Sequence, residues 1–167
     1  MAKRYETATY ISIGHRHAAT MKSMPSLYES DYFRWTQCTA AALRAGRLDG
    51  VDLVEVAEEI EDLGRSERRS LQSALAQLFL HLLKWDFQPE RRTRSWAASI
   101  KKQRNAVAGI LRENPSLTRC LYDAEFMASA YEDGFLSAVV ETNLDESTFP
   151  ARCPYTLDQI LSTESEK

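Results

Sequence analysis

Residues 53–96 read LVEVAEEIEDLGRSERRSLQSALAQLFLHLLKWDFQPERRTRSW, and no other segment says as much about the fold. An acidic stretch is followed by a basic one and then by a strongly apolar one. Apolar side chains recur there at three- and four-residue steps, which predicts a helix from about Glu67 to Asp86 that ends before Pro89. A helix this apolar is expected at the centre of the fold. Its predicted buried stripe is Leu71, Ala74, Leu75, Leu78, Leu82 and Trp85.

The acidic part of this segment predicts a second helix, with Asp52 as its N-cap. Gly64 allows two interpretations. Either it ends this helix and Ser66 caps the next one, or a single helix continues through it at a cost of about 1 kcal/mol relative to alanine. The apolar stripe of the acidic helix consists of Leu53, Val56, Ala57, Ile60 and Leu63.

The remainder of the chain also carries helical signals and no strand-like alternation. One helix is predicted from Ser26, its N-cap, to Arg44. Another begins after a Ser95 N-cap and stops at Asn114. A long helix follows a Ser116 N-cap, and a short last helix begins at a capping box, Thr156 with Gln159. The fold class is therefore all-α, a bundle of about four main helices plus short extra helices.

Length and composition indicate one soluble domain. The chain has 167 residues, 44% of them hydrophobic and 27% charged, which is typical of globular proteins. Residues 1–24 lack a sustained apolar period, so we expect a poorly ordered N-terminal extension followed by a single helical domain at 25–163. No apolar run approaches a membrane-spanning length, and we expect a cytoplasmic protein with no membrane contact. The widely spaced Cys38, Cys120 and Cys153 form no CxxC pair, which favours free, buried or half-buried thiols.

Charge is strongly segregated along the chain. The net charge is +3 over residues 1–24, −6 over 25–64, +8 over 65–119 and −8 over 120–167. In one interpretation, basic and acidic helices pack side by side and neutralise each other. In the other, the basic segment forms a patch for phosphate or nucleic acid. We prefer the first, because the acidic segments are large enough to balance the basic one.

Chemistry-bearing residues gather in two places within the opening segment. Glu58 and Glu59 could hold a metal or act in acid–base chemistry with His81, but no Glu-x-x-His repeat is present. We therefore predict no metal and no cofactor, and the absence of known catalytic signatures leaves the activity open. We expect the acidic side chains to face Arg68, Arg69 or the arginines of the next loop.

That loop, residues 88–94, contains the most specific candidate site in the sequence. Trp85 and Trp96 bracket its arginines, a combination that suits stacking or bidentate binding of carboxylate and phosphate. The preferred interpretation is structural, with a loop arginine bridging to Glu58 or Glu59. The candidate functional or structural cluster is Glu58, Glu59, His81, Lys84, Trp85, Gln88, Arg91, Arg92, Ser95 and Trp96.

The runs AEEIEDLGRSERRSL, HLLKW and QPERRTRSW resemble the domain-of-unknown-function 29 family of bacterial proteins. YESDYFRW near the start and FPARCPYTLDQIL near the end extend this resemblance from about Leu27 over most of the chain. The resemblance implies an all-helical fold and a bacterial, cytosolic setting. It implies no established activity and no catalytic residue.

Three functions follow as hypotheses. The leading one is a small helical binding or regulatory module that engages another protein, or itself, through an apolar and charged helical face. The alternative is a nucleic-acid-associated protein that uses the basic middle segment. The third is a metal-dependent or acid–base enzyme built on Glu58, Glu59 and His81. The basic residues of the alternative are Arg91, Arg92, Arg94, Lys101, Lys102 and Arg104.

Overall fold

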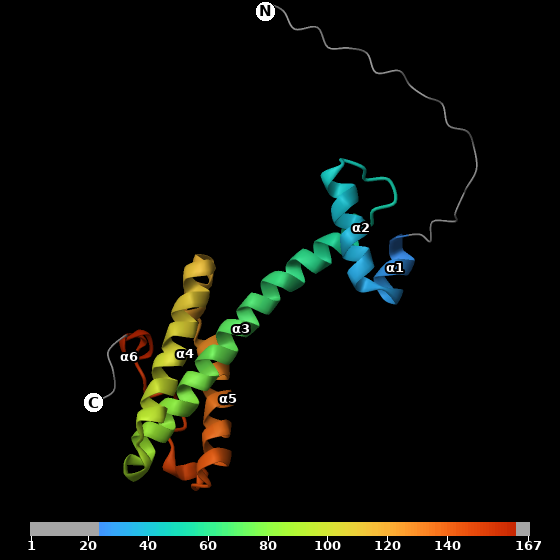
Figure 1. Ribbon diagram of the computed structural model, residues 1–167. Coiled ribbons are helices and arrows are strands. Elements are labelled where there is room, and N and C mark those ends of the chain that lie inside the picture. Colours follow the sequence, from blue (N-terminus) through green and yellow to red (C-terminus); the bar gives the residue numbers. More distant parts are fainter. Residues whose placement is uncertain (1–23, 163–167) are drawn as a thin grey trace, which may run out of the picture. The chain divides into compact units, whose positions relative to one another are not determined.

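The computed structural model describes residues 24–162, which contain helices and turns and no strand (Figure 1). The all-α prediction is confirmed. No helix within this described part is long and apolar enough to cross a bilayer. The helices are α1 (Met24–Ser30), α2 (Tyr32–Arg44), α3 (Leu53–Phe87), α4 (Arg94–Glu113), α5 (Ala124–Thr142) and α6 (Leu157–Leu161), with short 3-10 helices η1 (Pro89–Arg91), η2 (Pro115–Tyr122) and η3 (Glu146–Thr148).

Contacts divide the chain into two compact units, with the boundary between Val56 and Ala57. The single domain expected over residues 25–163 stays a prediction. The expected N-terminal extension, residues 1–24, lies outside the described residues except for Met24, which begins α1.

The first unit contains α1 and α2 where one helix was predicted. The correction has a local cause: Asp31 leaves the helical conformation (φ −156°), and its carboxylate accepts a hydrogen bond from the Arg34 N–H at 3.0 Å. Asp31, rather than Ser26, is therefore the N-cap of the helix that ends at Arg44. Trp35 is buried among Tyr28 and Tyr32, with ring centroids 5.0 and 5.6 Å from its own.

Helix α3 is continuous over 35 residues. Asp52 caps it as predicted, since its carboxylate accepts hydrogen bonds from Val54 N–H at 2.9 Å and Glu55 N–H at 3.2 Å. Gly64 lies inside the helix without a positive φ, so the continuous alternative is confirmed and Ser66 is not a cap. The small propensity cost at glycine is offset by the burial of the helix further along.

The core of the second unit surrounds the later half of α3, which packs with α4 and α5 (Figure 1). The predicted central position of this helix is confirmed: its residues Leu71, Leu75, Leu78, Phe79 and Leu83 are completely buried. Tyr131 on α5 and Ile100 and Val107 on α4 complete this layer.

Two helix starts differ from the prediction because a different side chain caps each helix. Thr93, in extended conformation, accepts a hydrogen bond from Trp96 N–H at 3.3 Å, so α4 is capped by Thr93 and not by Ser95. The long helix expected after Ser116 is instead η2 followed by α5. Asp123 separates them, because its carboxylate accepts hydrogen bonds from two N–H groups of the first turn of α5.

The C-terminal segment is fastened to the bundle by buried or half-buried polar groups. The predicted capping box of Thr156 and Gln159 is confirmed at the start of α6. The Tyr131 hydroxyl donates to the Pro150 carbonyl at 2.6 Å. Arg104, which the sequence grouped with surface cations, is buried and donates to the Gln159 carbonyl at 2.7 Å.

Candidate functional site

The predicted cluster falls into two groups on α3. Glu58 and Glu59 lie in its acidic early part, whereas the other members surround its end, η1 and the start of α4. His81 follows Glu59 by 22 residues in one continuous helix, which places them about 33 Å apart at 1.5 Å per residue. The structure therefore does not bring His81 and these carboxylates together. In the part of the chain that the structure describes, no three His, Cys, Asp or Glu side chains gather closely enough to hold a metal ion.

Arg92 holds the loop after α3 against the end of that helix. Its Nε donates to the Trp85 carbonyl at 2.8 Å, and its guanidinium carbon lies 5.0 Å from the centroid of the Trp85 ring. The expected bridge from a loop arginine to Glu58 or Glu59 is wrong, because a carbonyl and an aromatic ring nearby take their place. Trp85 is half-buried, so its ring is shared between the core and this stacking contact.

Lys84 forms the most buried ion pair of this end of the bundle. Its Nζ lies 2.6 Å from Glu141 Oε2 on α5 and 4.8 Å from the centroid of the Trp96 ring on α4. Only 13% of the Lys84 side chain is exposed. Lys84 and Trp96, both predicted members, thus meet at a junction of three helices. Glu141 was missed, and it lies 57 residues further along the chain.

His81 lies beside this pair in an apolar setting. Its Nδ1 is buried and has no hydrogen-bond partner among the described residues. Burial lowers the pKa of His81, the positive charge of Lys84 lowers it further, and Glu141 opposes both. A neutral packing histidine is the role that this environment favours.

Three further members of the cluster lie near the end of α3 and make no ion pair among the described residues. Gln88 is buried at the N-cap position of η1, where its N–H donates to the Lys84 carbonyl at 3.0 Å. Arg91 and Ser95 are exposed on either side of the loop. These residues form a junction between the end of α3, η1 and the start of α4.

The model of the family described as "Domain of unknown function DUF29" matches residues 27–165. The chain belongs to this family. The match includes α2, all of α3 and the whole bundle around it. No curated protein and no solved structure matches the chain.

Charge pairing within this DUF29 domain is sparser than its sequence suggested. Two ion pairs join different elements of the described chain: Lys84 with Glu141, and Arg68 with Asp123 at 3.8 Å. Arg65 pairs with Glu61 and Asp62 inside α3 itself. The expected neutralisation of basic helices by acidic ones is therefore wrong for α4, whose exposed cations make no ion pair among residues 24–162. These are Arg94, Lys101, Lys102 and Arg112.

Part of α3 is not covered by other helices of the second unit, although its apolar stripe was expected to be buried. Every residue from Glu61 to Ser70 is exposed, and Ile60 and Leu63 are 63% and 68% exposed. Ile60 precedes the fully buried Leu71 by 11 residues, close to three helical turns, so both lie on one face of the helix. The predicted apolar stripe thus exists, but between Ala57 and Leu63 the second unit does not bury it.

Proposed function

We propose that the chain is a helical binding module that associates with a second copy of itself through residues 57–70 of α3. The observation that carries this proposal is the exposure of Ile60 and Leu63 on the face that α4 and α5 bury further along. Contiguous exposed apolar side chains rimmed by charges are typical of interaction surfaces. Packing this face against a second helix would extend the core of the bundle.

The charges beside this face select the second copy as the partner. Four acidic residues precede three basic ones in the segment: Glu58, Glu59, Glu61 and Asp62, then Arg65, Arg68 and Arg69. In an antiparallel pair, the acidic half of each helix lies beside the basic half of the other. A parallel pair would place like charges together, which is unfavourable. Charge therefore sets the orientation, whereas the aliphatic side chains supply the attraction.

The expected association is modest. Full burial of an isoleucine or leucine side chain contributes about 1.5–3 kcal/mol, and two copies offer four such side chains. The loss of translational and rotational freedom costs about 4–15 kcal/mol. Because these quantities are of similar size, we expect a dimer whose population depends strongly on concentration.

The test is the mass in solution of the full chain over a range of concentrations, measured by light scattering after gel filtration. The wild type should rise from 19.0 kDa towards twice that value, and the Ile60→Lys, Leu63→Lys variant should remain at the monomer mass. Val140→Lys is the control, because Val140 is an exposed aliphatic residue on α5, outside the proposed surface. A wild type that stays monomeric throughout, or a control variant that behaves like the double variant, contradicts the proposal.

A second candidate function is nucleic-acid binding by the outer face of α4. Arg94, Lys101 and Arg112 fall on one face at spacings of 7 and 11 residues, about 120° around the helix from the buried Ile100 and Val107. This candidate predicts a strong salt dependence of binding to labelled DNA or RNA. Replacing the three cations with alanine should reduce the slope of log affinity against log salt by about 0.7–0.9 for each lost phosphate contact.

A further inference from the structure

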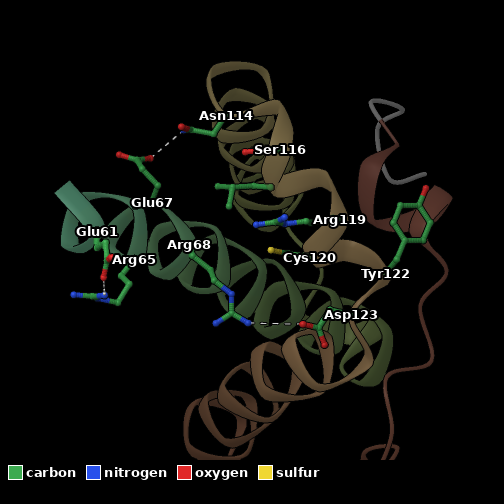
Figure 2. A pocket seen from close by; sticks show the side chains of 12 residues that line it. Glu61, Arg65, Glu67, Arg68, Asn114, Ser116, Arg119, Cys120, Tyr122 and Asp123 are labelled. Carbon is green, nitrogen blue, oxygen red and sulfur yellow. Dashed lines mark hydrogen bonds and ion pairs between the residues drawn. The ribbon is translucent and has the colours of Figure 1, made fainter. Parts of the chain in front are cut away.

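A hollow of about 820 Å³ opens where the covered part of α3 ends. It lies between α3, the 3-10 helix η2 and the first residue before α5 (Figure 2). Its volume is within the range of small-molecule sites, about 300–1,000 Å³. The lining brings together three guanidinium groups, those of Arg65, Arg68 and Arg119, and three carboxylates, those of Glu61, Glu67 and Asp123.

The carboxylates of the hollow already have partners within the chain. Glu61 accepts from Arg65 Nη1 at 3.3 Å. Glu67 accepts from the side-chain amide of Asn114 at 3.1 Å. Asp123 accepts from two N–H groups at the start of α5 through its Oδ1 atom. Each carboxylate thus has a hydrogen-bond donor within the chain, and Figure 2 shows those of Glu61 and Glu67 at the wall of the hollow.

Two of the guanidinium groups are less well satisfied. Arg119 makes no ion pair or hydrogen bond with its side chain among the described residues, although it lines the hollow. The Arg68 guanidinium stacks on the Phe126 ring, 4.7 Å from its centroid, and reaches Asp123 only at 3.8 Å, with both side chains about half exposed. Charge-assisted hydrogen bonds between guanidinium and an oxyanion are shorter, at about 2.7–2.9 Å. An oxyanion in the hollow could therefore form shorter hydrogen bonds with Arg68 than Asp123 does.

We infer that this hollow binds the phosphate or carboxylate group of a small polar ligand through Arg68 and Arg119. The planar guanidinium groups supply paired donors that match the geometry of either oxyanion. The Ser116 hydroxyl, also in the lining, offers a further donor. Because one chain builds the whole hollow, binding does not require the association proposed above. The Ile60→Lys, Leu63→Lys variant should therefore still show saturable binding as a monomer.

The experiment is a titration of isotope-labelled full-length protein with inorganic phosphate and, separately, with citrate at constant ionic strength. We expect saturable shifts of the backbone amide signals of Ser116, Arg119 and Tyr122 with at least one of the two probes. Arg119→Gln should weaken that binding at least tenfold. Arg152→Gln is the control, since Arg152 is exposed and lies outside the hollow, and it should titrate like the wild type.

The two probes distinguish the two oxyanion sources. Saturation by phosphate alone indicates a phosphorylated ligand, and saturation by citrate alone indicates a carboxylate ligand. The inference is overturned if neither probe gives saturable shifts. It is also overturned if Arg119→Gln titrates like the wild type.

Discussion

At the scale of single residues, Gly134 shows a constraint that the sequence pattern hides. The sequence places it inside a helix, where glycine is unfavourable by about 1 kcal/mol relative to alanine. In the structure, a Cβ atom on Gly134 would lie 2.5 Å from the Ala76 carbonyl oxygen and 2.8 Å from Phe79 Cβ. Only a residue without a Cβ lets α5 approach α3 this closely.

We therefore expect Gly134→Ala to destabilise the protein despite the better helix propensity of alanine. Overpacking of this kind lowers the free energy of unfolding by about 1–3 kcal/mol. Urea denaturation followed by circular dichroism measures the change. An unchanged or higher midpoint would show that α3 and α5 are further apart than described.

His81 predicts a specific pH dependence of stability. Its pKa in the folded protein is lowered from the ordinary histidine value of 6.5, chiefly by burial, with Lys84 adding to the shift and Glu141 opposing it. Between the lowered pKa and 6.5, the unfolded state binds more protons, so stability is fully present above pH 6.5 and is lost as the pH falls. The urea midpoint should drop between pH 7.5 and pH 5.5.

Replacing His81 with glutamine removes this titration. The drop in midpoint between the two pH values should become smaller in His81→Gln than in the wild type. An equal drop in both proteins would assign the acid sensitivity to other groups. This pH range lies well above the ordinary range of aspartate and glutamate, which limits their contribution.

At the scale of elements, local sequence signals predicted the ends of α3 well. Asp52 and Pro89 bound it because capping and proline chemistry act over a few residues. The starts at Asp31, Thr93 and Asp123 were missed because a serine elsewhere in the segment offered a similar cap. Which of the candidate residues leaves the helical conformation and caps the helix depends on packing, which the local sequence does not specify.

Because α3 continues through Gly64, replacing this glycine with alanine should change the stability in the opposite direction to the same replacement at Gly134. A Cβ atom on Gly64 would meet nothing within 4 Å. Gly64→Ala should therefore stabilise the protein by about 0.5–1 kcal/mol, as it does in helix interiors. If α3 ended at this glycine with a left-handed residue, the same urea experiment would show destabilisation instead.

At the scale of the whole chain, the lengths of the helices explain why part of the apolar face of α3 is exposed, which the sequence pattern did not predict. Helix α3 has 35 residues, whereas α4 has 20 and α5 has 19. Partners of that length cannot cover an apolar face that spans about 50 Å. The apolar period itself was visible in the sequence, but it does not say which of its turns are buried.

The candidate site was predictable only in part for a similar reason. Lys84, Trp85, Arg92 and Trp96 are close in sequence, so their gathering around the end of α3 could be anticipated. Glu141 joins them from a distant helix, and the hollow of Arg68 and Arg119 also joins distant segments. Such contacts depend on helix packing, which one sequence does not specify.

The central claim is that the uncovered face of α3 pairs with a second copy in antiparallel orientation. Its most direct test uses two charge-block variants of the full chain. One carries Glu58→Lys, Glu59→Lys and Glu61→Lys, and the other carries Arg65→Glu, Arg68→Glu and Arg69→Glu. Each variant has charges of mostly one sign along the segment and should repel itself, whereas the two should attract each other.

Sedimentation equilibrium of each variant alone and of an equimolar mixture gives the decisive masses. We predict 19.0 kDa for each variant alone and a rise towards twice that mass only in the mixture. Dimers formed by either variant alone, or a mixture that remains at the monomer mass where the wild type associates, would contradict the claim.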